Sequence, residues 1–426
     1  MTQNRRRPQA LPATLSLLAA VGGLAASAPA AAQISPWYVG ASQGFTHESN
    51  VYRLGRDTPT PAGVSRSDTM STTSLLAGLD QQISRQRLFG NVSLRANRFL
   101  DNTQLNNQSY GLNLGLDWAT VDRLSGNLNF GTSQNLARFT ANEFLAGFVT
   151  RRNIEDAQQF GASISRGVVT RLTAEAGVNW RRVRYSAPEY AFRENDQTSV
   201  SAGLRYRPSD GSSFGVGLRR SDGEYPHFGR NVDGSFIADS FARNDLYVNA
   251  DWTPGGAHSA EAKLSFGKTA YDVATERNFS GLTGSLGWTW RPTGKLRLRT
   301  TLARDSGLNS YLFDTGFVDG VADYSRTTTA LSLRVDYEVS AKIASHATLT
   351  QTARSLTNRA TPAGGVPVIE TGRDRGTRLA LGASWAPTRN SVVSCDLSQE
   401  TRDGATQLSV PRSTGSFGCS GQILLR

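Results

Sequence analysis

The chain has 426 residues, a formal net charge of +11 and a charged fraction of 19%. Its hydrophobic fraction is 38%, and beyond residue 32 no apolar run approaches the ~20 residues that a spanning helix needs. No break in composition marks a linker between domains. These features exclude a helical membrane protein and favour a single domain rich in strands and turns.

The first 32 residues are typical of a secretory signal peptide. Three arginines at residues 5–7 precede a small, apolar segment over residues 11–24, and the alanines at 30–32 form an A-x-A type cleavage site. We therefore expect a signal peptide over residues 1–32 and a mature domain over residues 33–426. The ordinary secretory route is favoured over the twin-arginine route, because no fitting apolar residues follow the arginines. Removal of three arginines lowers the formal charge from +11 to +8.

The mature sequence alternates between apolar and polar residues almost throughout. From Tyr110 to Trp118, the even positions are Tyr, Leu, Leu, Leu and Trp, and the odd positions are Gly, Asn, Gly and Asp. A strand points successive side chains to opposite faces, so this segment has one apolar face and one polar face. The same period of two recurs down the chain and predicts an all-β protein.

The predicted connections alternate between two kinds. Short turns follow an aromatic-x-Pro pattern that occurs four times, beginning at Tyr206, Trp252, Trp290 and Trp385. The other connections are longer and more polar, and the expected ones are 47–71, 135–153, 222–240, 305–325 and 356–375. Short turns at one rim and long loops at the other are typical of outer-membrane barrels.

The predicted fold is therefore a transmembrane, antiparallel, up-and-down β-barrel in the outer membrane, with about 18 strands and a range of 16–18. Closure is required because lipid offers no partner to the unpaired backbone groups of a sheet edge. A soluble β-sandwich or propeller would not place bulky aromatics so regularly at one end of its strands. Strands are expected to start near residues 37, 72, 88, 108, 124, 157, 170, 198, 214, 246, 259, 281, 296, 327, 343, 377, 391 and 414. Phe99, Phe139 and Phe241 are expected in an outer aromatic girdle.

Arginines are prominent on the predicted lumen face. The candidates that line the lumen are Arg95, Arg181, Arg205, Arg219, Arg297, Arg299, Arg334 and Arg378. Either they favour anions in a confined channel, or they pair with carboxylates of the same face. Those carboxylates are Asp80, Asp117, Glu175, Asp251, Glu261, Asp336 and Asp396. The loop 135–153, with Phe139, Phe144, Leu145 and Phe148, either folds inward as a constriction or caps the outer surface.

The two cysteines lie in the last two predicted strands. Cys395 and Cys419 are symmetric about the loop between these strands, which places them opposite each other on one face. Either they form a cross-strand disulfide, as the oxidising periplasm allows, or they are two free thiols facing lipid. The four histidines have no metal-like spacing, and we expect no enzymatic activity, no cofactor and no nucleic-acid partner.

Two regions resemble the β-barrel porin type 2 family, and within it the barrels encoded in exopolysaccharide biosynthesis operons. These regions are 37–53, where Glu48-Ser49-Asn50-Val51-Tyr52-Arg53 has Ser49 in place of the family's Asp, and 385–426. The resemblance implies a role in exopolysaccharide export, as conduit or accessory, with anionic polysaccharide or export components as partners. A general or anion-preferring porin and a structural or adhesive barrel with an occluded lumen are the alternatives. Outer-membrane lipid and lipopolysaccharide are expected contacts in each case, and the oligomeric state is open.

Overall fold

The computed structural model describes residues 35–139, 149–167, 171–231, 233–306, 325–360, 368–404 and 409–426. The predicted signal peptide, residues 1–32, lies outside these residues. The strands are β1 (Trp37–Glu48), β2 (Asp68–Ile83), β3 (Gln86–Phe99), β4 (Asn107–Ala119), β5 (Leu124–Leu136), β6 (Ile154–Arg166), β7 (Leu172–Tyr185), β8 (Asn195–Ser209), β9 (Ser212–Arg230), β10 (Phe236–Gly255), β11 (His258–Tyr271), β12 (Phe279–Trp290), β13 (Leu296–Asp305), β14 (Ser325–Ser340), β15 (Ile343–Ala360), β16 (Val368–Thr388), β17 (Ser391–Gly404) and β18 (Arg412–Leu425). Short 3-10 helices η1 (Thr103–Leu105), η2 (Pro188–Arg193) and η3 (Thr275–Arg277) interrupt three of the loops. No helix of the described residues is long and apolar enough to cross a membrane.

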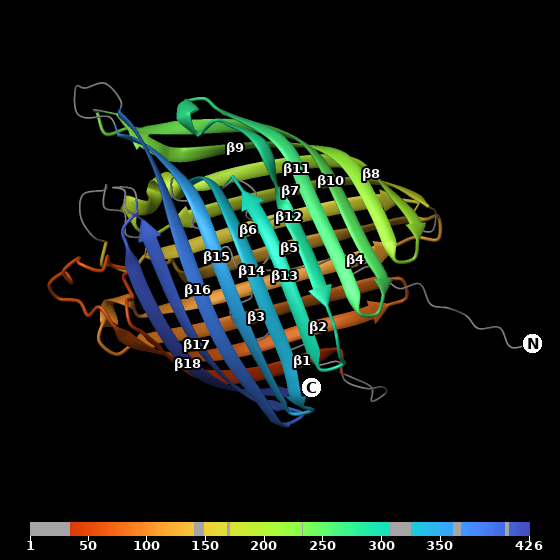
Figure 1. Ribbon diagram of the computed structural model, residues 1–426, viewed down its shortest axis with the longest axis horizontal. Coiled ribbons are helices and arrows are strands. Elements are labelled where there is room, and N and C mark those ends of the chain that lie inside the picture. The colour runs from red at the N-terminus through yellow and green to blue at the C-terminus, as the bar shows by residue number, and fades with distance from the viewer. Residues whose placement is uncertain are drawn as a thin grey trace, which may run out of the picture.

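These strands form one closed antiparallel sheet of 18 strands, so the predicted fold class is confirmed. Each strand pairs with its neighbour in the sequence, and β1 pairs with β18 to close the barrel, with Val39 opposite Leu425. The first and last strands therefore begin and end at the same rim, and the strands wrap obliquely around a common axis (Figure 1). Closure leaves no edge strand whose backbone groups lack a partner.

The outer face of the barrel is apolar. The strand register aligns hydrophobic side chains on the outside. One such set of opposed positions crosses β8 to β12 and consists of Ala202, Leu218, Leu246, Phe266 and Leu282. Leu218 is 65% exposed and Phe266 is 62% exposed. Such exposure is costly in water but favourable in hydrocarbon, so this face fits a bilayer.

Aromatic side chains lie on this outer face next to the short turns, where a membrane-interface girdle is expected. The ring of His258 lies parallel to those of Trp288 and Trp290 at this rim, with centroids 6.0 Å apart in each pair. The prediction of a second aromatic girdle, at the long-loop rim, is wrong for all three residues named. Phe99 and Phe241 face the lumen, and Phe139 is buried against Tyr52 of the loop after β1.

Several strands extend farther from the short-turn rim than the sequence predicted. The strand expected near Leu246 begins at Phe236, and the expected loop 222–240 is mostly the hairpin of β9 and β10. The strand expected near Thr377 begins at Val368. We call the band of outward hydrophobic side chains around the barrel the apolar belt. Beyond this belt both faces of a strand meet polar surroundings, so the sequence no longer alternates between apolar and polar residues although the backbone pairing continues.

Candidate functional site

The register places all eight predicted arginines on the inner face of the barrel. Arg95 shares a face with Asn97, Arg181 with Asn179, Arg205 with Glu175, Arg219 with Asp245, Arg297 with Asp336, Arg299 with Arg334 and Arg378 with Glu400. The seven predicted lumen carboxylates have the same orientation, because each alternates with an outward apolar neighbour. The predicted arginines and carboxylates therefore all lie on the inner wall.

Four of the eight arginines are paired with carboxylates of this wall. Arg205 contacts Glu175 at 2.8 Å, Arg219 contacts Asp245 at 2.9 Å, Arg299 contacts Glu261 at 2.9 Å, and Arg334 contacts Asp336 at 2.8 Å. Arg95 and Arg297 form no ion pair within the described residues. The pairing interpretation therefore applies to these four arginines, and the anion-favouring interpretation stays a prediction.

The lumen near the short-turn rim is open to solvent. Arg87 pairs with Asp80 there, and both side chains are about half exposed. Arg299 and Glu261 show similar exposure. Ion pairs between exposed groups contribute only about 0.2–1 kcal/mol each to stability. The main effect of these pairs is therefore on the electrostatic field inside the barrel.

The lumen near the long-loop rim is instead narrowed by the expected loop after the first strand, whose inward fold the sequence did not predict. Residues 49–67 follow β1 and pack on the inner wall, where Tyr52 and Leu54 join Phe99 of β3 and Leu105 of η1 in a buried cluster. Gln104 donates a hydrogen bond to the Tyr52 hydroxyl, which donates to Asn102. Burial raises the pKa of the Tyr52 hydroxyl to about 12, so this group stays protonated and remains a donor at neutral pH.

The predicted constriction loop, 135–153, lies only in part within the described residues. Phe144, Leu145 and Phe148 lie outside them. Phe139 packs on Tyr52, with ring centroids 4.8 Å apart, so the described start of this loop joins the same inward cluster. The loop after β1 therefore supplies most of the described packing at this rim.

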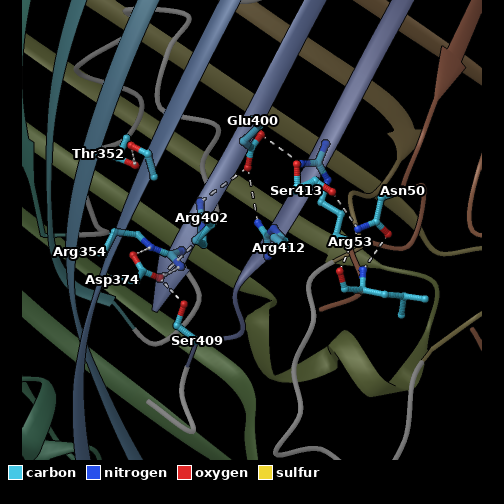
Figure 2. A network of polar contacts seen from close by, with 12 residues as sticks. Asn50, Arg53, Thr352, Arg354, Asp374, Glu400, Arg402, Ser409, Arg412 and Ser413 are labelled. Atoms are coloured by element: carbon cyan, nitrogen blue, oxygen red, sulfur yellow. Dashed lines mark hydrogen bonds and ion pairs between the residues drawn. The ribbon is translucent and has the colours of Figure 1, made fainter. Parts of the chain in front are cut away.

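Next to this cluster, six arginines gather around three carboxylates, from β1, from β15 to β18 and from the loops after β1 and β5. We call this set the arginine cluster, and its members are Arg53, Arg138, Arg354, Arg378, Arg402 and Arg412 with Glu48, Asp374 and Glu400. The set holds six guanidinium groups and three carboxylates, so it is rich in positive side chains. Figure 2 shows Arg402 and Arg412 pointing from neighbouring strands toward Glu400, and Arg354 toward Asp374.

Strand register explains how the arginine cluster forms. Arg402 of β17 lies opposite Arg412 of β18, and Arg354 of β15 lies opposite Asp374 of β16. Arg53 comes from the loop after β1, where it has a positive φ of 56°, and contacts Glu400 at 3.1 Å. Only Arg378 of this cluster was among the predicted residues. The inner-face parity of Asp396 and Glu400, continued past the apolar belt, would have found Arg402.

A second polar group on the opposite wall was missed as well. Arg243 and Asp245 are both fully buried, with Arg243 Nη2 2.8 Å from Asp245, and Arg243 also donates hydrogen bonds to Thr283 and Ser306. The hydrogen-bonding atoms of this group have partners within the protein, so we interpret its role as structural.

The cysteines are joined. Cys395 and Cys419 form a disulfide on the outer, lipid-side face of the last hairpin. No group of histidines, cysteines and carboxylates in the described part of the chain could hold a metal ion.

No known protein family matches the sequence, and no curated protein matches it. Among solved structures the chain is similar to the outer-membrane protein OpdK of Pseudomonas aeruginosa, with 12% identity, a TM-score of 0.49, and coverage of 91% of this chain and 99% of that chain. It is also similar to OccK5 (OpdH) of the same organism, with 11% identity, a TM-score of 0.47 and coverage of 92% and 98%. For the FrpB iron transporter of Neisseria meningitidis, the identity is 13%, the TM-score is 0.46 and the coverage is 87% and 62%. The fold assignment rests on this chain's own strand pairing.

Proposed function

We propose that this protein is an outer-membrane channel for small solutes that prefers anions. The observation that carries the proposal is the arginine cluster, where six guanidinium groups face three carboxylates beside the long-loop mouth. Field lines concentrate in a polar passage with low-dielectric walls, so a group rich in guanidinium side chains there raises the local concentration of anions.

The apolar outer face supports the location, because a closed barrel with large hydrophobic side chains outside is stable only in a bilayer. Beyond the apolar belt, cations such as Lys268 and Arg304 face outward and form no ion pair within the described residues. Anionic lipopolysaccharide is the partner that this position favours. The solvent-exposed ion pairs in the lumen near the short-turn rim, which we call the lower lumen, support an aqueous passage there.

Ion selectivity is the direct test of this proposal. Purified mature protein would be inserted in a planar bilayer with a potassium chloride gradient, and the reversal potential would be measured. We expect a reversal potential whose sign shows that chloride is more permeant than potassium. A cation-selective channel would contradict the preference, and a barrel without conductance would favour the alternative of a structural or adhesive barrel with an occluded lumen.

The role in exopolysaccharide export stays a prediction that rests on the motif-level resemblance alone. Deletion of the gene, followed by measurement of secreted polysaccharide and of small-solute uptake, distinguishes it from the porin function. Loss of polysaccharide with normal uptake would favour export over the channel function that we propose. The absence of enzymatic activity likewise stays a prediction.

A further inference from the structure

Three buried hydrogen-bonding atoms without a partner lie together in the arginine cluster. They are Nε of Arg402, Nε of Arg412 and Oγ1 of Thr414. Eight such atoms occur in the described part of the chain, and three of the eight are clustered on two adjacent strands. An unpaired buried polar atom costs free energy, and a group of such atoms in one place indicates a missing partner.

The two internal carboxylates, Asp374 and Glu400, do not supply that partner, and Asp374 lies 3.8 Å from Nη1 of Arg402. Glu400 lies 4.0 Å from Arg402 and 3.7 Å from Arg412, which are ion-pair distances beyond hydrogen-bonding range. The closest contact of Glu400 is to Arg53, at 3.1 Å. Arg402 and Arg412 also lie directly opposite each other, and like charges at opposed positions repel unless an anion lies between or beside them.

The neighbouring strand places no side chain of its own beside Arg402. Gly376 of β16 is opposite Arg402, and it has no side chain to cover the guanidinium. A Cβ at that position would lie 3.9 Å from Nε of Arg402 and 2.7 Å from the hydroxyl of Thr352. The Thr352 hydroxyl therefore takes the place of a side chain at 376, and the surroundings of the Arg402 guanidinium on this side are polar.

We propose that Arg402, Arg412 and Thr414 form a binding site for an oxyanion, namely the carboxylate or phosphate group of a solute. Guanidinium groups suit such oxygens because their donors lie in a rigid fork. The side chains of both arginines are mostly buried, which strengthens their attraction for an anion. The proposal rests on the channel function, since the solute reaches the site from the lumen.

Titration of single-channel current tests the site. Inorganic phosphate and acetate would be added separately to wild-type channels in chloride at constant ionic strength. We expect a saturable fall in conductance with at least one of them, and the anion that acts identifies the group. In R402Q/R412Q the half-saturating concentration should rise about tenfold or more, because two charge-assisted contacts are lost. In E400Q it should fall, because the competing internal carboxylate becomes neutral.

The matched control is R87Q/R334Q, which removes the same charge from the inner wall elsewhere. Its half-saturating concentration should change much less than that of R402Q/R412Q, because these two arginines contribute only to the general field of the lumen. Absence of saturation by both anions, an unchanged value in R402Q/R412Q, or an equal change in the control would overturn the site. E400Q keeps the test decisive should the double variant fail to fold, since weaker binding there also overturns the site. Anion selectivity without saturation would leave the channel function standing, so the two failures are distinguishable.

Discussion

Cys395 of β17 and Cys419 of β18 lie at directly opposed positions of the last hairpin and are joined by a disulfide, with their Cα atoms 4.1 Å apart. The bond faces outward, and Cys419 lies opposite Phe45 of β1 in the closing strand pair. It therefore reinforces the hairpin that completes the barrel. Sequence symmetry about the intervening loop predicted the opposed positions, and the structure decides between the two alternatives in favour of the disulfide.

Replacement of both cysteines by serine should lower the stability of the barrel without preventing its formation. With a sequence separation of 24 residues, the chain-entropy argument gives an upper limit of about 3 kcal/mol. The temperature at which the folded band is lost in unboiled electrophoresis measures the effect. The matched control is S394A/S420A, which removes the neighbouring hydroxyl pair of 3.0 Å on the inner face and should cost about 1 kcal/mol. A smaller shift for the cysteine variant than for this control would contradict the expectation.

Replacement of Arg297 and Arg299 by serine should shift ion selectivity toward cations. Both side chains lie on the inner face of β13, and loss of Arg299 also leaves Glu261 without its partner at 2.9 Å. The local field in the lower lumen then becomes negative, which attracts cations. The reversal potential in a potassium chloride gradient measures the shift.

The control for this selectivity change is K268S/R304S. It removes two positive charges from the outer face, at the long-loop side of the apolar belt. Its reversal potential should match the wild type, because lipid and the barrel wall separate these positions from the lumen. Equal shifts in both variants would show that net charge, and not lumen charge, determines the selectivity.

The orientation of β12 can be tested by the same substitution at adjacent positions. Leu286 faces outward and is 45% exposed, whereas Ser285 faces the lumen opposite Lys263. L286R should cost about 2–4 kcal/mol in the bilayer, whereas S285R should cost about 1 kcal/mol or less, because its penalty is only repulsion from Lys263 in the aqueous lumen. Urea titration in detergent-free vesicles, followed by tryptophan fluorescence, compares the two. A larger loss at Ser285 would reverse the assignment of the two faces.

Sequence alone predicted the barrel, because a strand that separates lipid from water must alternate. Leu282, Leu286 and Trp288 on one face of β12, with Ser285 on the other, show why the signal is strong within the apolar belt. The arginine cluster was mostly missed because Arg402 and Arg412 lie near the long-loop rim, where both faces are polar. Arg53 could not be found at all, since its position depends on a loop that folds inward.

The loop after β1 narrows the long-loop end of the lumen, and its anchor is Leu54. This side chain is fully buried among Tyr52, Leu105 and their neighbours, and Asn50 hydrogen-bonds both its backbone N–H and its carbonyl oxygen. Leu54→Ala removes buried methyl groups, which costs about 2–5 kcal/mol in a packed cluster. The inward fold of the loop should weaken, and single-channel conductance should rise or fluctuate between two levels. Val121→Ala in the exposed β4–β5 turn is the control and should leave conductance unchanged. A Leu54→Ala channel with wild-type conductance and noise would mean that the loop does not restrict the passage.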